Sequence, residues 1–271
     1  MAEASSRFSF ARLDTNLIAP PVYMSAGIDG SLTIVARGDH IPLRYRRAMH
    51  AFRFAQYWKL GFLDRNLVGI DEYAAEVAGA PPGREYHTMV LDRASGYAAA
   101  YVYMTLPDPA ASGVPFTLEK EYDVTVGETV AKGMGRDRTW EAKRLVRRIG
   151  IPWSDLARNA PWWALLGLSF LTVRLWENGE LESFVADGAR EGSPQMFEHL
   201  GFAVDCSEER PRSENASGPY GPMWRQERIP VAYSCMTYRD HESHLRRVET
   251  LLKGNRGMSV RKQLSAWRQD D

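Results

Sequence analysis

A charged stretch, WEAKRLVRRIGIP (residues 140–152), mixes acids and bases with the apolar residues of an expected strand. Trp140, Ala142 and Val146 alternate as one face of a pleated strand should. Arg144 falls in register with these apolar residues, where a guanidinium would be buried. Such a side chain either binds a ligand or a partner, or marks a local irregularity of the strand.

Arg144 has two interpretations. As a buried cation it needs an anionic partner, and the acidic segment that contains Asp71 and Glu72 is the best source. A one-residue bulge would instead turn Arg144 towards solvent. We favour the paired interpretation, in which Arg144 anchors the structure or a substrate.

Further basic residues crowd the same stretch: Arg136, Arg138, Lys143, Arg147 and Arg148. A run of this kind usually forms a solvated face of the protein. Its functional alternative is a surface for an acidic partner or a phosphate group, which arginine recognises well.

The first helix is expected between His40 and Trp58, where apolar residues recur at helical spacing, and it should end near Gly61. Arg44 and Arg46 lie on another face of this helix. A solvated face explains the two arginines as well as substrate binding does, and a core aromatic explains Trp58 equally well.

Other chemistries find little support. The 34 basic and 34 acidic side chains cancel, so no overall field favours nucleic acid. Cys206 and Cys235 fit neither a disulfide framework nor a zinc motif. The histidines His87, His199, His241 and His244 lack a third ligand at metal spacing, so we expect no metal site. No Gly-x-Ser-x-Gly elbow occurs, which disfavours a serine nucleophile.

Residues 160–176 form the longest apolar run, but they are few for a membrane span and include Arg174. We expect a buried helix there, with Asn159 as its cap, and no membrane span. The first residues lack the pattern of a signal peptide, so a cytoplasmic location is expected.

The expected elements alternate between strands, hairpins and helices. Strands are predicted at 31–39, 139–149, 181–189 and 229–238, a hairpin between 84 and 108, a helical turn at 116–124, and further helices at 159–177, 193–202 and 241–253. This order predicts an α/β fold with a mixed, mostly antiparallel central sheet and helices on both faces.

We expect three parts along the chain. Residues 1–30 lack periodicity and are predicted to be a flexible N-terminal arm. Residues 31–240 should form one domain with a long loop at 205–226, which is rich in Ser, Pro, Gly and charge. Residues 241–271 should form a C-terminal helix and a polar tail.

The order of elements, together with FEHLGF (residues 197–202), resembles the GNAT acyltransferase fold. More narrowly, residues 32–204 resemble the acyl-homoserine-lactone synthases and the long-chain N-acyl amino acid synthases. Four features carry this resemblance: the arginine-rich helix before Trp58, the Asp71-Glu72-Tyr73 segment, the hairpin that ends in Leu106-Pro107, and the pair Glu141 and Arg144 on one strand.

The resemblance implies an N-acyltransferase that uses acyl-CoA or an acyl carrier protein as thioester donor and a small amine as acceptor, with no tightly bound cofactor. Glu141 would deprotonate the amine, or, alternatively, pair with Lys143 or an arginine as an ordinary strand carboxylate. Substrate contacts are implied for Arg44, Arg46 and Trp58, and for Asp71 and Glu72.

The donor side is implied by a second match. Arg147, Arg148 and Gly150 resemble the pyrophosphate loop of the GNAT fold, with Pro152 in place of its last small residue. Phe197 stands where many CoA-dependent relatives carry a tyrosine that protonates the departing thiolate.

Two other functions stay open. The chain has Ala74 and Met104 where the synthases usually carry an Asp and an Arg, which favours a GNAT-like protein that binds acyl thioesters or a partner without turnover. A conventional acetyltransferase with a short-chain donor is the third hypothesis.

Overall fold

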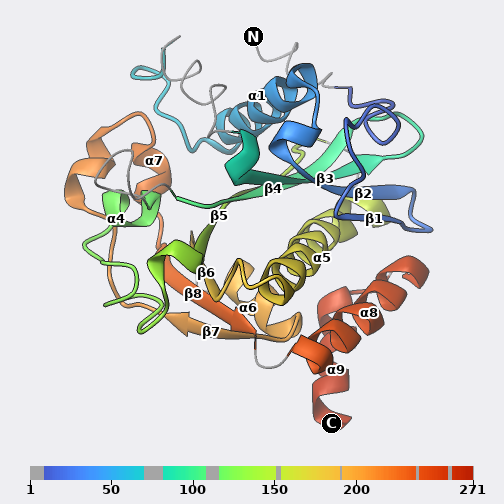
Figure 1. The fold of residues 1–271 in the computed structure, drawn as a ribbon. Coiled ribbons are helices and arrows are strands. Elements are labelled where there is room, and N and C mark those ends of the chain that lie inside the picture. Colours follow the sequence, from blue (N-terminus) through green and yellow to red (C-terminus); the bar gives the residue numbers. More distant parts are fainter. Residues whose placement is uncertain are drawn as a thin grey trace.

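An eight-stranded sheet forms the centre of the molecule (Figure 1). The computed structural model describes residues 9–69, 82–107, 116–150, 154–189, 191–235, 238–255 and 258–270. The strands are β1 (Tyr23–Ala26), β2 (Ser31–Arg37), β3 (Glu85–Asp92), β4 (Ala98–Thr105), β5 (Thr139–Arg147), β6 (Ser183–Gly188), β7 (Phe202–Cys206) and β8 (Ile229–Cys235).

The strands lie in the order β1-β2-β3-β4-β5-β6-β8-β7. Every neighbouring pair is antiparallel except β5 and β6, which are parallel. A parallel pair needs a crossover connection, and the long helix between β5 and β6 supplies it. The predicted mixed, mostly antiparallel sheet with helices on both faces is therefore confirmed.

Helices cover both faces of the sheet (Figure 1). They are α1 (Leu43–Leu60), α4 (Thr117–Glu121), α5 (Asp155–Glu177), α6 (Ser193–His199), α7 (Gly221–Trp224), α8 (Tyr238–Gly254) and α9 (Val260–Asp270). Short 3-10 turns occur at Gly38–His40, Pro82–Arg84, Arg136–Arg138 and Ser213–Ser217.

Helix α5 forms the main core on one face. Its residues from Ala160 to Leu175 are almost all buried, against the strands and against α8, as the apolar run predicts. The predicted cap is wrong: the helix begins at Asp155, and the Ser154 hydroxyl accepts the Ala157 N–H at 3.2 Å. Asn159 lies inside the helix, where its side-chain amide donates to Asp29.

The opposite face carries α1, α4 and α7. Helix α1 ends, as predicted, where Gly61 adopts a left-handed conformation with a φ of 70°. Its apolar side packs on Ile34, Met89 and Tyr101 of the sheet. This face holds the charged strand residues that the sequence singles out.

The predicted flexible arm is wrong for the described residues 9–30. Phe10 and Leu13 are buried in the core beneath α1. Phe10 N–H donates to the Gly96 carbonyl at 2.7 Å, which ties the segment to the hairpin turn. Strand β1 then adds an edge to the sheet, paired with β2. The segment lacks long-range periodicity because each of its parts is short.

The C-terminal prediction is wrong in part as well. Helix α8 occurs as expected, but α9 follows it where a polar tail is predicted, and Val260 and Leu264 bury their side chains in the core. Strand β7 (Phe202–Cys206) begins at the last residue of the predicted helix and ends within the predicted loop. Apolar residues in these segments are few, so tertiary contacts decide their structure.

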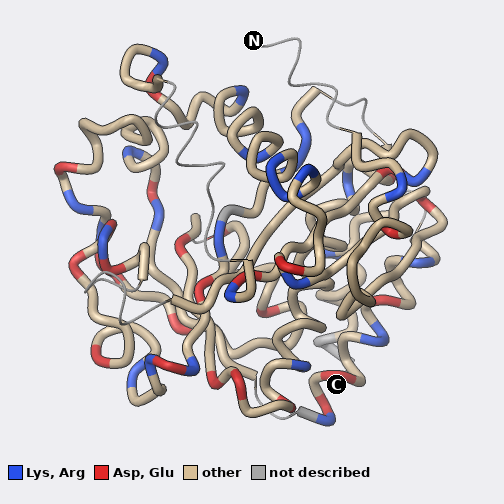
Figure 2. Tube along the Cα trace, turned by 45° about the horizontal axis from the view of Figure 1, so that its top comes forward, with Lys and Arg blue, Asp and Glu red and all other residues tan. Residues whose placement is uncertain are grey.

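Lys and Arg are interspersed with Asp and Glu along the chain trace (Figure 2). The net charge of the whole sequence is zero. Within the described residues, no helix is long and apolar enough to cross a membrane.

Two histidines of α8 hold the end of α6. The Nε2 atom of His241 donates to the Leu200 carbonyl at 2.8 Å, and that of His244 donates to the His199 carbonyl at 2.8 Å. These bonds satisfy carbonyls at the helix C-terminus, which have no partner within the helix. Burial lowers the pKa of His241 to about 4.

His241 should make the free energy of unfolding depend on pH. The unfolded chain takes up a proton on this histidine below its ordinary pKa of 6.5, while the folded chain leaves it neutral down to about 4. Stability therefore falls as pH falls from 6.5 towards 4, by up to roughly 3 kcal/mol. Urea unfolding between pH 7 and pH 4.5 measures this, and His241→Gln should flatten the slope.

His40→Gln is the matched control, because His40 is partly exposed and outside the core. It should leave the slope as it is in the unmodified protein. A His241→Gln variant with an unchanged slope would contradict the assignment.

Candidate active site

Strands β5 and β6 run side by side for only three residue pairs. The pairs are Thr139 with Ser183, Trp140 with Phe184, and Glu141 with Val185. Beyond Glu141, β5 continues along β4, while β6 continues along β8. The two parallel strands thus part at Glu141, and from there the β6-facing edge of β5 has no β6 partner.

A β-bulge in β5 follows directly after the parting. Tyr103 pairs with Lys143 and Tyr101 pairs with Val146, so two residues of β5 stand opposite one residue of β4. Trp140 therefore contributes to the core beneath α5, whereas Val146 contributes to the core beneath α1. The predicted common face is wrong, because the bulge reverses the alternation.

The bulge includes Arg144, whose backbone lies at this irregularity. The backbone agrees with the bulge interpretation of Arg144. Its side chain lies outside the described part of the structure, as do Asp71 and Glu72, the acids predicted to pair with it.

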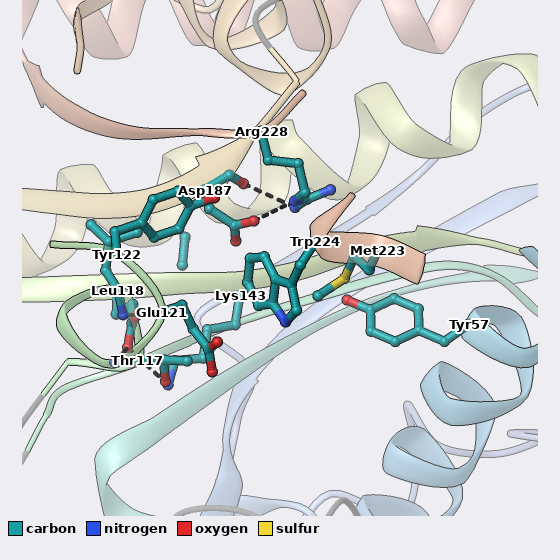
Figure 3. Close-up of a pocket in the computed structure, with 12 residues that line it drawn as sticks. Tyr57, Thr117, Leu118, Glu121, Tyr122, Lys143, Asp187, Met223, Trp224 and Arg228 are labelled. Atoms are coloured by element: carbon teal, nitrogen blue, oxygen red, sulfur yellow. Dashed lines mark hydrogen bonds and ion pairs between the residues drawn. The ribbon is translucent and has the colours of Figure 1, made fainter. Parts of the chain in front are cut away.

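A small pocket lies beside the parting, on the face of α1 and α4 (Figure 3). Its lining combines aromatic with charged side chains: Tyr57, Thr117, Leu118, Glu121, Tyr122, Glu141, Ala142, Lys143, Asp187, Met223, Trp224 and Arg228. The cavity encloses about 30 Å³, which is room for one or two water molecules. Trp224 belongs to the lining and lies at the centre of the labelled residues (Figure 3).

Glu141 lies in this lining with its side chain almost fully buried. Its carboxylate accepts the backbone N–H groups of Thr117 at 3.0 Å and Leu118 at 2.8 Å, and Lys143 Nζ lies 2.8 Å from it. It therefore satisfies the first N–H groups of α4, which has no side-chain cap of its own. These three donors use most, but not all, of the roughly four acceptor sites of the carboxylate.

The far side of the pocket carries a second ion pair and a phenol. Arg228 Nε donates to the Asp187 carboxylate at 2.5 Å, and Figure 3 shows this pair above Trp224. Tyr122 is fully buried beside them and meets Trp224 edge to face. Burial, with the nearby Asp187 charge, raises the pKa of Tyr122, so its hydroxyl stays protonated at neutral pH.

The predicted acceptor-side residues are not brought into this pocket. Arg44 is exposed and lies over the ring of Tyr45, and Arg46 Nε donates to the Ile41 carbonyl at 3.3 Å. Trp58 is partly buried near the end of α1, with Arg65 over its ring. The residue of α1 that lines the pocket is Tyr57.

The predicted donor-side residues lie just beyond β5. Arg148 N–H donates to the Ala99 carbonyl, and Ile149 N–H donates to the buried Gln56 side chain, both at 2.8 Å. Those two amides are thus already bonded within the protein. Arg147 and Gly150 are exposed, and Gly150 has a φ of 85°.

Phe197 has a place in the core. It packs against Phe184, Phe202 and Tyr233, with ring centroids 4.6 to 5.3 Å apart. Only 2% of its surface is exposed, and it does not line the pocket at Glu141.

Several pocket residues escape prediction from sequence. Tyr122 follows a five-residue helix, and Trp224 and Arg228 lie in or just after the segment predicted as a loop. The one signal for them is the length of that segment, since a long loop within a compact domain is often functional. No spacing rule connects Tyr122 with Trp224.

One buried group has the composition of a metal site. The ligand atoms of His50, Glu85 and His87 all lie within 4.8 Å of one another. The prediction that the histidines lack a third ligand at metal distance is wrong here, because α1 crosses β3 and adds His50 to the Glu-x-His pair of the strand.

Comparisons with known proteins give a likeness of fold only. No family model matches the sequence, and no curated protein does. Among solved structures, the acyl-homoserine-lactone synthase LasI is 12% identical with a TM-score of 0.45, covering 75% of this chain and 89% of that chain. FeeM, an N-acyl amino acid synthase from uncultured soil microbes, is 10% identical with a TM-score of 0.47, covering 78% and 94%.

The CoA-dependent acyl-homoserine lactone synthase MesI is 13% identical with a TM-score of 0.40, covering 80% of this chain and 89% of that chain. The matches thus include the two synthase groups that the sequence motifs resemble. At these identities no residue role is transferred from them.

Glu141 should stabilise α4. Glu141→Ala removes the acceptor of two backbone N–H groups and the partner of Lys143, so we expect a loss of about 3 kcal/mol in the free energy of unfolding. Glu141→Gln should lose less, because its amide oxygen still accepts one N–H. Urea unfolding measures both variants.

The control is Glu177→Ala, which removes an exposed carboxylate at the end of α5 and should stay within about 0.5 kcal/mol. If Glu141→Ala is as stable as this control, the carboxylate does not hold α4.

Proposed function

We propose that this protein is an N-acyltransferase, which moves an acyl group from acyl-CoA or an acyl carrier protein to the amine of an amino-acid-like acceptor. The observation that carries the proposal is the parting of β5 from β6 at Glu141, followed by the bulge. Main-chain N–H groups at such an edge suit a polarised thioester carbonyl, because fixed donors stabilise the charge that develops on its oxygen.

The proposed reaction forms one bond and breaks one. The amine nitrogen attacks the thioester carbonyl, a C–N bond forms, and the C–S bond breaks with release of a thiolate. The amine loses a proton and the thiolate gains one. Glu141 takes the first proton, directly or through water. The Tyr122 phenol lies on the same lining, is protonated at neutral pH like any tyrosine, and supplies the second.

The charges in the pocket suit an acceptor with both an amine and a carboxylate. The lining carries the cations Lys143 and Arg228 and the anions Glu121 and Asp187. Lys143 is paired with Glu141 and Arg228 with Asp187, so an acceptor would exchange with these ion pairs. Arg144, Asp71 and Glu72 stay assigned to the acceptor as predictions. The basic residues Arg136, Arg138, Arg147 and Arg148 stay assigned to the donor as a prediction, for either the phosphates of CoA or the acidic face of a carrier protein.

A thioester needs more room than the cavity provides. Small-molecule sites enclose about 300–1,000 Å³, whereas this cavity holds about 30 Å³. In the proposal α7 moves away when the donor binds, because Met223 and Trp224 occupy the lining and their helix is only four residues long.

A second candidate function is a protein that binds acyl thioesters without turnover. The three donors around the Glu141 carboxylate favour it, since they occupy the group that the transfer reaction requires.

Mass spectrometry separates these functions. The protein is incubated with acyl-CoAs and acylated carrier proteins of graded chain length, together with a panel of amino acids. N-acylated amino acids with medium or long chains are the expected products. Products with acetyl groups alone would indicate a conventional acetyltransferase, and donor binding without product would indicate the second candidate.

Glu141→Gln should lower kcat by about 100-fold or more, the usual contribution of a general base, with donor affinity nearly unchanged. Glu177→Gln is the control and should retain full turnover. A parallel melting curve shows that the variant is folded. Equal losses in turnover and donor affinity would remove Glu141 from the catalytic role.

A further inference from the structure

Three side chains converge beneath α1, outside the lining of the pocket at Glu141 but only two strands from it, since Glu85 pairs with Thr105 and Thr105 with Glu141. His50 comes from α1, and Glu85 and His87 come from one face of β3. Each is at most 2% exposed. Their ligand atoms lie within 4.8 Å of one another although the chain separates His50 widely from the other two.

The contact between Glu85 and His87 does not have the geometry of a hydrogen bond. Glu85 Oε1 lies 3.0 Å from His87 Nε2. Nevertheless, the described residues provide no hydrogen-bond partner for this nitrogen or for either oxygen of Glu85. If no hydrogen lies between Glu85 Oε1 and His87 Nε2, each atom has a lone pair that is not used. Both lone pairs could then bind the same third atom.

The buried carboxylate strengthens this argument. A carboxylate taken out of water is strongly destabilising unless charges or donors compensate it, so such groups are paired or bind metals. A metal cation between Glu85 and His87 would compensate the carboxylate, which within the described residues otherwise has only the ion pair that His87 forms with it when protonated.

The other nitrogen of the His87 ring is already held. His87 Nδ1 lies 2.7 Å from the hydroxyl of Tyr101, and the two rings are stacked. Histidines that bind metals almost always donate their second N–H to such a partner, which fixes the ring and leaves the other nitrogen as a ligand. The His50 ring meets the His87 ring edge to face, with centroids 5.7 Å apart.

We propose that His50, Glu85 and His87 bind one divalent transition-metal ion, of which Zn²⁺ is the representative. Two imidazoles and one carboxylate are a common ligand set for Zn²⁺. Tetrahedral ligands at about 2.0–2.1 Å from zinc lie roughly 3.3 Å from one another, close to the 3.0 Å between Glu85 and His87. The ion would join α1 to β3 and would require only small shifts of His50.

The proposed metal site does not rest on the proposed acyl transfer. Metal binding alone tests the proposal, and it can be measured whether or not the protein has any activity.

The test uses the full-length protein, stripped with a chelator, dialysed and titrated with Zn²⁺ and Co²⁺. We expect one ion per chain by elemental analysis, visible absorption bands of tetrahedral Co²⁺, and a higher melting temperature with metal. Glu85→Gln and His87→Gln should abolish stoichiometric binding. Tyr101→Phe removes only the partner of His87 Nδ1 and should weaken affinity by about 10–100-fold.

His244→Gln is the control, since His244 lies in α8, on the other face of the sheet. It should bind metal as the unmodified protein does. The proposal is overturned if the unmodified protein binds less than stoichiometric Co²⁺ and Zn²⁺, or if binding persists in Glu85→Gln. Should Glu85→Gln or His87→Gln fail to fold, the unmodified titration and Tyr101→Phe decide the question.

Discussion

The single parallel pair in an otherwise antiparallel sheet is the constraint on which this structure depends. Strand β5 pairs with β4 on its other side, and β6 pairs with β8. Helix α5 connects β5 to β6 as a crossover, so these two strands run in the same direction. They remain together for three residue pairs and then separate. The bulge of β5 and the contacts between α4 and Glu141 lie where the two strands separate. Residues of α7 line the pocket beside this place.

Glu141 illustrates how a structural and a chemical role compete for one group. The backbone of Glu141 forms the last pair between β5 and β6. Its carboxylate binds the N-terminus of α4 and lines the pocket. Hydrogen bonds that position a carboxylate also occupy it. Three donors leave about one of its four acceptor sites for a substrate amine.

The strongly patterned or strongly apolar elements could be predicted from sequence: β2, α1, the hairpin of β3 and β4, and α5. Helix α1 repeats apolar residues at helical spacing, whereas β4 and α5 are apolar runs that are buried almost throughout. Short elements such as β1, β7 and α9 could not, since the partner that buries them is distant in the chain. The site divides in the same way. Glu141 carries a local signal, whereas Tyr122, Trp224 and Arg228 meet only in the folded chain, as does His50 with Glu85 and His87.

The central claim is that the gap between β5 and β6 receives the thioester. A crystal structure with a non-hydrolysable thioether analogue of a long-chain acyl-CoA tests this most directly. The account predicts the sulfur between the parted strands, near Glu141 and the bulge, with α7 displaced. An analogue bound elsewhere, with Trp224 still filling the pocket, would contradict it.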